Sequence, residues 1–283
     1  MFVIGTAGHV DHGKSTLVKA LTGMNPDRLK EEQVREMTIE LGFAWLKLSD
    51  GNEIGIIDVP GHRNFVNNML AGVGGIDLAL LVIAADEGIM PQTKEHLAIL
   101  DLLNINPGII VLTKTDLVKD GDWLDLVEVD ILEAVKNTGF HNAPIVRVSA
   151  KTGSGLEQLI SQIQELIPFL PPKVDLGRAR LPIDRVFTLA GFGTVVTGTL
   201  LDGKLEVGQE IEILPGGNKA KIRGLQTHKK KENVAFPGSR TAVNLSGIDV
   251  NQIHRGQVLV SPGKYEGSAR IDAELSILEA TQF

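Results

Sequence analysis

The sequence contains no cysteine among its 283 residues, and aromatic side chains make up only 4% of it. Without cysteine, the chain has no disulfide framework, no thiolate metal ligand and no cysteine nucleophile, which leaves phosphate, carboxylate and histidine chemistry as candidates. Positive charge is also scarce, because 28 Lys and Arg residues against 35 Asp and Glu residues give a formal net charge of -7. The chain therefore has no general attraction for nucleic acid or membrane surfaces, so any RNA contact must use a local basic patch.

Long apolar runs are absent as well. No stretch approaches the roughly 18 apolar residues that a membrane span needs, and the short run Phe2-Val3-Ile4 follows Met1 without a basic flank. We therefore expect no secretion and no membrane insertion, and we expect a cytoplasmic protein. The chain length and the 43% hydrophobic content predict roughly two globular domains.

In the first half of the chain, short apolar runs alternate with amphipathic stretches, which predicts a mostly parallel sheet with helices on both faces. The Asp50-Gly51 step predicts a tight antiparallel hairpin between the second and third strands. The predicted strands are Phe2–Gly5, Leu41–Leu48, Glu53–Val59, Leu78–Ala84, Gly108–Thr113 and Pro144–Val148. The predicted helices are Lys14–Gly23, Pro91–Leu103, Gly121–Thr138 and Leu156–Ile167.

Three prolines within Ile167–Pro172 predict an extended connector and a domain boundary, so residues 1–172 would form the α/β domain. Residues 173–267 carry Val, Ile and Thr runs broken by glycine at turn-sized spacings, which predicts a small all-β barrel. Residues 268–283 contain another strand-like run, Ile271–Leu278, which we interpret as the start of a truncated third domain.

A phosphate-binding motif lies between the first predicted strand and the first predicted helix. Residues Gly8–Ser15 match G-x-x-x-x-G-K-[ST], whose glycines allow backbone N–H groups to surround a phosphate. Lys14 would add a point charge, while His9 and His12 would shape the loop. The predicted nucleotide-binding residues here are Asp11, His12, Gly13, Lys14, Ser15 and Thr16.

Three oxygen-bearing side chains are candidates for a magnesium ion. Asp58 closes a predicted strand, where a carboxylate reaches magnesium through water, and the hydroxyls of Ser15 and Thr38 would complete the shell. The backbone of Gly61 would contact the outermost phosphate. His62 follows directly and is the predicted catalytic residue, because its imidazole would orient the attacking water.

Two further motifs predict that the base is guanine. Asp116 would accept hydrogen bonds from the N1 and exocyclic amino groups of guanine, a donor pair that adenine lacks. The backbone N–H of Ala150 would donate to the guanine O6. The predicted base-site residues are Thr113, Lys114, Asp116, Ser149, Ala150 and Lys151. The chain is therefore predicted to bind GTP or GDP together with Mg²⁺.

These motifs resemble those of the translational GTPases, in which the phosphate loop reads Gly-His-Val-Asp-His-Gly-Lys and the second switch reads Asp-x-Pro-Gly-His. The corresponding residues here are Gly8–Lys14 and Asp58–His62. The stretch Gly191–Gly198 is similar to the opening of the barrel domain in elongation factor Tu. The resemblance thus implies a P-loop GTPase domain followed by a small β-barrel.

Within that group, Met37–Ala44 and Asn68–Asp77 resemble the selenocysteine-specific elongation factors. So does Thr113, where elongation factor Tu has asparagine, and a shorter side chain there would buttress the base site less. The resemblance implies delivery of selenocysteinyl-tRNA to the ribosome with hydrolysis of GTP. In that family a messenger RNA insertion element is read by a C-terminal region outside these residues.

The same resemblance implies an aminoacyl pocket between the two domains, formed by Phe43, Asp184, Arg185 and Arg240. The Arg240 guanidinium would favour an ionised selenol over a serine hydroxyl, and Asp184 would bind the esterified amino acid's α-amino group. The alternative is a barrel surface on which Asp184 and Arg185 form salt bridges with neighbouring residues.

Other readings of the chain stay open. One alternative is another translational GTPase, either similar to elongation factor Tu or the tRNA-binding subunit of an initiation factor. A second is a GTP-dependent scaffold that does not hydrolyse GTP.

Val10 and Met37 would form an apolar gate before His62, which predicts slow intrinsic hydrolysis. Glu36 replaces the family's usual glycine, so the first switch, roughly Asn25–Glu40, would fold or move differently.

The basic cluster His228–Lys231, with Lys221 and Arg223 nearby, has two interpretations. It would meet an RNA backbone, or it would form a solvated hairpin tip.

Overall fold

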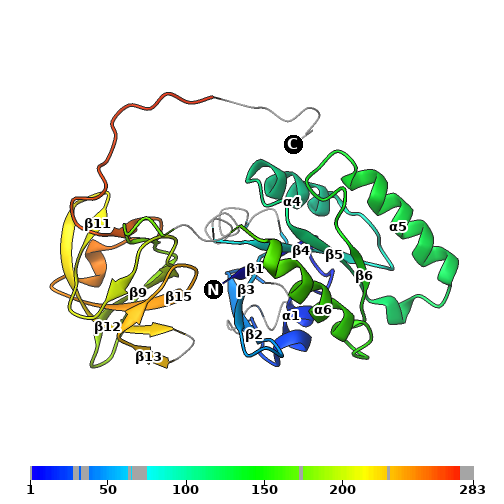
Figure 1. Cartoon of the computed structure of the whole chain (residues 1–283), viewed down its shortest axis with the longest axis horizontal. Helices are drawn as coiled ribbons and strands as arrows, with labels where there is room; N and C mark the ends of the chain where they lie inside the picture. The colour runs from blue at the N-terminus through cyan, green and yellow to red at the C-terminus, as the bar shows by residue number, and fades with distance from the viewer. Residues whose placement is uncertain are drawn as a thin grey trace.

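The computed structural model describes residues 2–27, 32, 38–62, 65, 75–171, 175–227 and 230–274. These residues form an α/β domain and a β domain that lie side by side (Figure 1). The prediction of two structural units of these classes is confirmed.

A six-stranded sheet forms the centre of the first domain, in the order β2-β3-β1-β4-β5-β6. Its strands are β1 (Val3–Ala7), β2 (Gly42–Lys47), β3 (Glu53–Asp58), β4 (Leu78–Ala84), β5 (Gly108–Thr113) and β6 (Ile145–Arg147). Neighbouring strands are parallel except for the antiparallel pair β2 and β3. The carboxyl ends of β1, β3, β4, β5 and β6 therefore share one edge of the sheet, where ligands bind in such folds.

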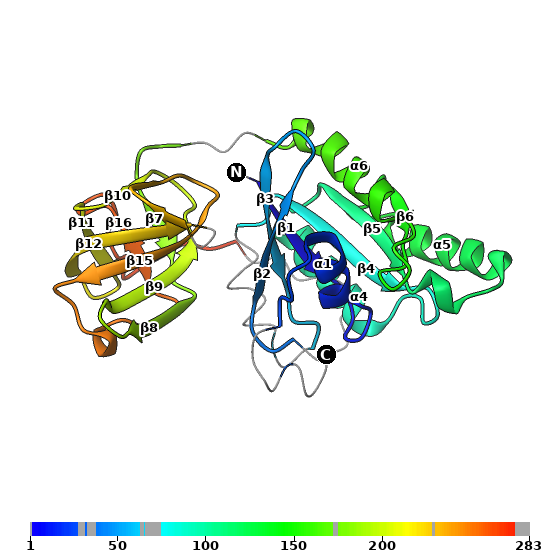
Figure 2. The ribbon, with the colours of Figure 1, turned by 90° about the horizontal axis from the view of Figure 1, so that it is seen from below.

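Helices cover both faces of this sheet, as Figure 2 shows from below. α1 (Lys14–Thr22) and α6 (Leu156–Leu166) pack on one face, and α4 (Pro91–Leu102) and α5 (Gly121–Val135) pack on the other. Two short 3₁₀ helices, η2 (Thr115–Leu117) and η3 (Ile167–Phe169), follow β5 and α6. The predicted arrangement of a mostly parallel sheet between helices is confirmed.

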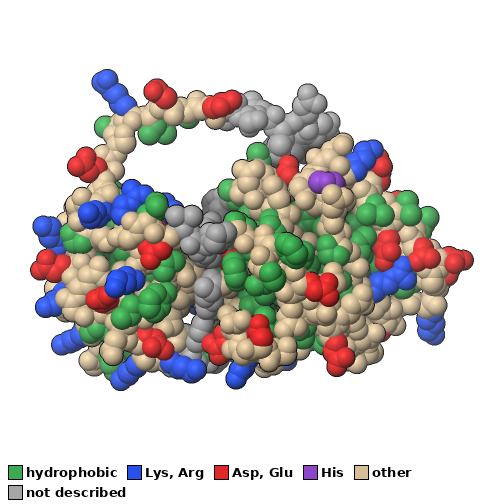
Figure 3. All heavy atoms as spheres, in the orientation of Figure 1, with side chains coloured by type: hydrophobic (Ala, Val, Ile, Leu, Met, Phe, Trp, Pro, Cys, Tyr) green, Lys and Arg blue, Asp and Glu red, His purple; other side chains and the backbone are tan. Residues whose placement is uncertain are grey.

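The second domain is an antiparallel sheet in the order β7-β16-β11-β12-β15-β9-β8, with β13 paired to β12. Backbone hydrogen bonds of Arg180 with Leu201 and Asp202 join β7 to the chain just after β9, which closes the sheet into a barrel. The elements are β7 (Arg180–Pro182), β8 (Arg185–Leu189), β9 (Gly193–Thr199), β10 (Leu205–Glu206), β11 (Glu210–Leu214), β12 (Asn218–Thr227), β13 (Lys230–Glu232), β14 (Val234–Ala235), β15 (Arg240–Ser246), η4 (Val250–Gln252) and β16 (Val258–Val260). Lys and Arg side chains are spread around the outer side of this barrel (Figure 3).

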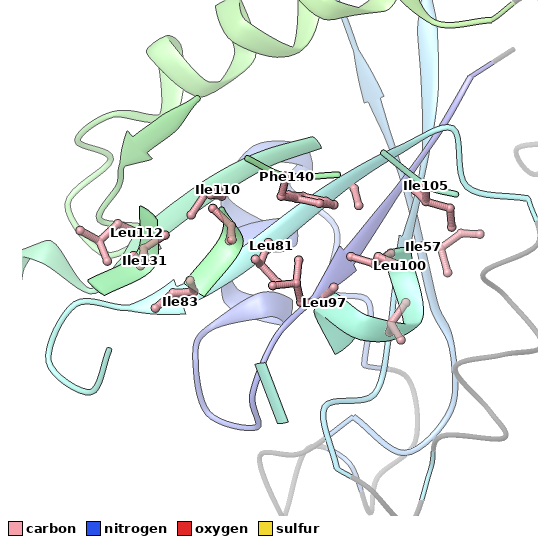
Figure 4. Close-up of a cluster of buried hydrophobic side chains, with 14 of the residues drawn as sticks. Ile57, Leu81, Ile83, Leu97, Leu100, Ile105, Ile110, Leu112, Ile131 and Phe140 are labelled. Atoms are coloured by element: carbon pink, nitrogen blue, oxygen red, sulfur yellow. The ribbon is translucent and has the colours of Figure 1, made fainter. Parts of the chain in front are cut away.

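Three buried clusters hold these elements together. In the α/β domain, Leu97 and Ile131 belong to the cluster beneath α4 and α5 (Figure 4), and Leu17 and Ile163 belong to the cluster beneath α1 and α6. β4 is buried at all seven positions because both faces of a parallel sheet are covered. A third cluster fills the barrel.

The four helices begin at the predicted residues, and β4 and β5 have both predicted ends. The other ends lie within three residues of the predicted ones. α1 ends at Thr22 rather than Gly23, because Gly23 is its C-cap with a φ of 72°. α5 ends at Val135 rather than Thr138, since the Thr138 N–H donates to the Val135 carbonyl in a tight turn. Gly51 has the predicted positive φ, 87°, in the hairpin between β2 and β3.

Two predictions about connecting segments were wrong in part. Ile167–Phe169 forms η3 rather than an extended connector, because proline is tolerated in the first turn of a helix. Residues 271–274 form no strand, because no neighbouring strand pairs with them, and the rest of the predicted run lies outside the described residues. None of the helices among the described residues has the length and apolar character that a membrane crossing requires.

Candidate functional site

The loop between β1 and α1 lies at the edge of a cavity of about 650 Å³. Gly8 has a φ of 135°, and a side chain there would meet the Val82 carbonyl oxygen at 2.2 Å. Gly13 has a φ of 83° and caps the N-terminus of α1. Both positions require glycine, so the motif spacing is dictated by the backbone. The described residues lining the cavity are Val10, Asp11, Gly13, Lys14, Ser15, Thr16, Lys19, Asn25, Asp27, Glu32, Thr38 and Gly61.

Lys14 is buried at the floor of this loop. Its Nζ donates to the carbonyl oxygens of Gly8, at 3.1 Å, and His9, at 2.5 Å. Burial lowers the pKa of the Lys14 amine to about 8, although Asp58 and other nearby carboxylates oppose this shift. An anionic phosphate beside the amine would favour its charged form, and the N-terminus of α1 points its positive dipole end the same way.

The three predicted magnesium ligands lie together. The Ser15 Oγ is 2.8 Å from the Thr38 Oγ1 and donates to the Asp58 Oδ2 at 2.7 Å. The Thr38 hydroxyl donates to the Asp27 Oδ1 at 2.9 Å. Both hydroxyls therefore lie within hydrogen-bond distance of each other and of a carboxylate.

This arrangement fits a small divalent cation. Adjacent ligands of an octahedral magnesium ion, with bonds of about 2.0–2.1 Å, are roughly 3 Å apart, close to the separation of the two hydroxyl oxygens. Among the described residues no group of three or more His, Asp or Glu side chains is arranged to hold a metal. A cation here would therefore use hydroxyl, water and phosphate oxygens, with the carboxylates accepting hydrogen bonds behind them.

Two carboxylates around this site are shifted toward protonation. Burial raises the pKa of Asp58 to about 6, although hydrogen bonds from Ser15 and Thr6 oppose this shift. Burial also raises the pKa of Asp27, which a hydrogen bond from Thr38 opposes. A cation nearby would favour the ionised form of both.

Sequence reasoning missed Asp27, Thr6 and Glu32. The Thr6 hydroxyl donates to the Asp58 Oδ1 at 2.7 Å and accepts from the Val59 N–H, so it fixes the carboxylate. The Glu32 Oε1 accepts from the N–H groups of Ile39 and Glu40, just beyond Thr38. None of the three belongs to a recognisable motif. The only available signal was that two of them are acidic residues within the predicted first switch.

Gly61 and His62 take different positions. Gly61 lies against the phosphate loop, where an added Cβ would be 2.5 Å from the Lys14 Nζ and 2.8 Å from the Val10 backbone nitrogen. The His62 ring packs near the Phe65 ring, with centroids 5.9 Å apart, and is not among the described residues that line the cavity. The catalytic role of His62 stays a prediction.

The predicted base-site residues meet at the carboxyl ends of β5 and β6. The Ser149 Oγ donates to the Asp116 Oδ1 at 2.7 Å and accepts from the Thr152 N–H. Ala150 and Lys151 lie in the turn that follows. Lys114 has a φ of 57°, and its Nζ lies 3.6 Å from a Glu87 carboxylate oxygen. The two loops therefore adjoin, as the guanine prediction requires.

Thr113 joins the base site to the phosphate loop. Its hydroxyl donates to the His12 carbonyl at 2.7 Å. Burial lowers the pKa of His12 to about 3, so its imidazole is neutral. The His12 Nε2 lies 3.3 Å from a Glu87 carboxylate oxygen, and because the imidazole is neutral this contact is not an ion pair.

Three of the four predicted aminoacyl-pocket residues, Phe43, Arg185 and Arg240, line a cavity of about 230 Å³ between the domains, whereas Asp184 does not line it. The Arg240 guanidinium carbon lies 3.3 Å from the centroid of the Phe43 ring, a cation–π contact. Arg240 is paired with Asp184 through both terminal nitrogens, and the Thr197 hydroxyl also donates to Asp184.

Arg185 reaches from the barrel to the α/β domain. One of its terminal nitrogens donates to the Leu41 carbonyl at 3.0 Å and lies 2.8 Å from the Glu40 carboxylate. The structure thus brings the four residues together. It also pairs Asp184 with Arg240 and Arg185 with Glu40, and the alternative interpretation expects such salt bridges. Both interpretations stay open, because a ligand would have to share these partners.

Some sequence predictions fall on residues outside the described part of the chain: Glu36, Met37, residues 68–74, His228 and Lys229. In the remainder of the basic cluster, Lys221 and Arg223 point outward from β12, and Lys230 and Lys231 lie exposed on β13. Lys221 pairs in register with Glu210, so acidic neighbours accompany the cluster.

Comparison with known proteins agrees with this geometry. The model of the elongation factor Tu GTP-binding domain matches residues 1–169, and the model of elongation factor Tu domain 2 matches residues 193–260.

Curated relatives are similar over nearly the whole chain. The selenocysteine-specific elongation factor of Desulfomicrobium baculatum is 53% identical over 279 residues, which cover 99% of this chain and 44% of that protein. The protein of the same name from Escherichia coli (strain K12) is 44% identical over 277 residues, which cover 96% of this chain and 44% of that protein. This chain thus spans less than half the length of these relatives.

Solved structures show the same similarity. A bacterial selenocysteine-specific elongation factor superposes with a TM-score of 0.88 at 37% identity, covering 94% of this chain and 45% of that one. Elongation factor SelB from Methanococcus maripaludis, in complex with a GTP analogue, has a TM-score of 0.83 at 35% identity, covering 92% of this chain and 55% of that one. The resemblance inferred from the sequence motifs is confirmed.

Proposed function

This chain belongs to the elongation factor Tu family of GTP-binding proteins, and from that premise we propose that it is a magnesium-dependent GTPase that delivers selenocysteinyl-tRNA to the ribosome. The observation that carries the GTPase proposal is the convergence of Lys14, Ser15, Thr38 and Gly61 on one cavity. The similarity of the chain to a selenocysteine-specific elongation factor over 99% of its length supports selenocysteinyl-tRNA as the cargo.

The residues of the proposed GTP site would have distinct tasks. Lys14 and the loop N–H groups bind the β- and γ-phosphates, and the hydroxyls of Ser15 and Thr38 hold Mg²⁺. When bound, the ion neutralises charge on the phosphate oxygens. The Gly61 N–H would contact the γ-phosphate, since only glycine fits so close to Lys14 and Val10. His62 orients the attacking water.

Guanine selectivity would follow from Asp116. Its Oδ1 is already oriented by the Ser149 hydroxyl, so the carboxylate is held for the paired donors of guanine. Ala150 would donate its N–H to the O6 atom. We expect GTP and GDP to bind and ATP to be excluded, because the adenine edge offers neither the donor pair nor that acceptor.

Selection of selenocysteine would use the cavity between the domains. A selenolate is anionic at neutral pH and would pair with Arg240, whose guanidinium is held between Asp184 and the Phe43 ring. The α-amino group would bind Asp184, so the aminoacyl group adds an anion and a cation to an existing ion pair. The proposed partners are therefore selenocysteinyl-tRNA and the ribosome, and the proposed location is the cytoplasm. A messenger RNA insertion element would be read outside these residues.

The GTPase proposal is tested by turnover of GTP with and without ribosomes. We expect slow intrinsic hydrolysis, ribosome stimulation, and loss of that stimulation in His62→Ala with nucleotide affinity unchanged. Nucleotide binding without turnover under any condition would favour the non-hydrolysing scaffold instead.

The cargo is tested by protection of the aminoacyl ester against hydrolysis with a GTP analogue bound, comparing selenocysteinyl-tRNA with seryl-tRNA on the same tRNA body. Selective protection should be lost in Arg240→Ala but kept in Arg255→Ala, an exposed arginine of the same barrel outside the basic cluster. Equal protection of both esters would overturn the selenocysteine assignment and favour a general elongation or initiation factor.

A further inference from the structure

Two backbone amides of the phosphate loop are held from outside the loop by α4. The Gly8 N–H donates to the His96 Nδ1 at 3.0 Å, and the Val10 N–H donates to the Gln92 Oε1 at 3.2 Å. Gln92 and His96 are four residues apart, so they lie on the same face of the helix. One face of α4 therefore accepts both amides.

Lys14 contacts one of these two peptide groups at its carbonyl oxygen. Its Nζ donates to the His9 carbonyl at 2.5 Å, and that carbonyl shares a peptide plane with the Val10 N–H. Its second contact, at 3.1 Å, is to the Gly8 carbonyl. The His9–Val10 peptide is thus fixed at its oxygen by Lys14 and at its nitrogen by Gln92.

His96 is suited to a permanent acceptor role. It is 1% exposed, and burial lowers its pKa to about 3, so the imidazole stays neutral. Because the Nδ1 accepts the Gly8 N–H, the ring hydrogen belongs on the Nε2. Gln92 is only partly buried, and its Oε1 can be removed without opening a large cavity.

The peptide that Gln92 holds is also the one against which Gly61 packs. An added Cβ at Gly61 would be 2.8 Å from the Val10 nitrogen and 2.5 Å from the Lys14 Nζ. A rotation of this peptide would move both the His9 carbonyl oxygen, which accepts from Lys14, and the Val10 nitrogen, against which Gly61 packs. Holding it in place therefore affects both phosphate binding and the Gly61 contact.

We propose that Gln92 and His96 are positioning residues that hold the phosphate loop in its nucleotide-binding form and thereby slow nucleotide release. The proposal rests on the proposed GTP site and deepens it. In this proposal α4 acts on the nucleotide indirectly, by holding the backbone of the phosphate loop. Neither the Gln92 nor the His96 side chain is among the residues that line the cavity.

The test measures the dissociation rate of a fluorescent GDP from the 283-residue chain, chased with unlabelled GDP. Gln92→Met and His96→Leu each remove one acceptor at similar side-chain size. A neutral hydrogen bond of this kind corresponds to a roughly two- to tenfold faster release. His96→Asn keeps an acceptor near the position of Nδ1 and should release GDP within about twofold of the unsubstituted chain.

Lys94→Ala is the matched control, because Lys94 is exposed on the same helix. It should leave the rate unchanged. Thermal melts are recorded in parallel, since a merely structural role would lower the melting temperature without speeding release. If His96→Leu does not fold, Gln92→Met carries the test alone.

Two negative outcomes are distinguishable. If the unsubstituted chain binds no guanine nucleotide, the proposed function is overturned, and this inference with it. If the unsubstituted chain binds GDP but a folded Gln92→Met variant releases it no faster, only the inference about α4 is overturned.

Discussion

At the residue scale, single buried side chains connect parts of the site that the motifs describe separately. Thr113 was expected to buttress the base site less than the asparagine of elongation factor Tu. In the structure its hydroxyl reaches the phosphate loop, at 2.7 Å from the His12 carbonyl. The Thr113 side chain therefore contacts the backbone of the phosphate loop, while Asp116, the proposed base ligand, is held by Ser149.

Gly61→Ala tests the contact between the second switch and the phosphate loop. The added methyl would overlap the Lys14 Nζ and the Val10 nitrogen, so we expect the switch to withdraw from the γ-phosphate. The affinity for a GTP analogue should fall by roughly tenfold relative to GDP, the loss expected for one charge-assisted hydrogen bond. Titration of both nucleotides checks this ratio. Gly121→Ala is the control, because nothing lies within 4 Å of an added carbon there; an unchanged ratio in Gly61→Ala would contradict the proposed contact.

Stability should respond to acid through His96. Burial lowers its pKa to about 3, whereas the unfolded side chain titrates near 6.5. The unfolded state therefore binds more protons between these values, and this contribution to stability is lost as pH falls below about 6.5. At pH 5.5 the loss is roughly 1.4 kcal/mol.

Urea unfolding at pH 7.5 and 5.5 measures this effect. The raised pKa values of Asp58 and Asp27 increase the stability as the pH falls, which opposes the effect of His96. The pH-dependent drop in unfolding free energy is therefore compared between variants that differ only at a histidine. The drop in unfolding free energy should be about 1 kcal/mol smaller in His96→Asn than in the unsubstituted chain. His254→Asn, at an exposed site, should keep the full drop. Equal drops in all three proteins would mean that His96 does not carry the effect.

At the element scale, each helix is held by a few side chains that face the sheet. Adjacent residues of α5 show the contrast, because Ile131 is fully buried and Leu132 is 48% exposed. The helix also shows Trp123, Leu126 and Val129 to solvent, so its sequence is more apolar than its buried face requires. Composition alone therefore overstates how much of α5 is core.

Ile131→Ala should lower the free energy of unfolding by roughly 2 to 5 kcal/mol, because it leaves a cavity between α5 and the sheet. Leu132→Ala should change it by no more than about 0.5 kcal/mol. Denaturant melts of both variants provide the comparison. Similar losses in the two would show that α5 does not pack as described.

At the scale of the whole molecule, the described parts of the two domains meet around Phe43, Arg185 and Arg240. Gly75 adds a close approach, since a Cβ there would be 3.1 Å from the Thr199 side chain. Arg185 contacts Glu40 and Leu41, which follow Thr38 by two and three residues. The proposed magnesium ligand Thr38 and the segment that Arg185 contacts are therefore separated by only a few residues of the chain.

Arg185→Ala should loosen the association of the domains while changing stability little, because exposed ion pairs contribute about 1 kcal/mol or less. Small-angle X-ray scattering should show a larger radius of gyration than in the unsubstituted chain. Arg223→Ala removes an exposed barrel arginine and should leave the scattering unchanged. Identical curves for the two variants would rule out Arg185 as a link between the domains.

Local patterns in the sequence were sufficient for the fold class and for the ten predicted helices and strands of the α/β domain to within three residues. They also singled out the motif residues that lie together around the proposed phosphate and base sites. Apolar periodicity marks which segments pack on a sheet, and the phosphate loop needs glycine where the backbone takes a positive φ, as at Gly8 and Gly13. These properties depend on near neighbours in the chain.

Only the tertiary structure decided which distant side chains complete the site. Asp27 behind Thr38, Thr6 behind Asp58, and His96 behind Gly8 have no motif of their own, and the last pair is 88 residues apart in the chain. The same holds for Arg240, which meets Asp184 when the barrel closes and meets the Phe43 ring only when the two domains come together. A hydrogen bond between distant residues depends on where the whole chain places its donor and acceptor, and no local pattern encodes that position.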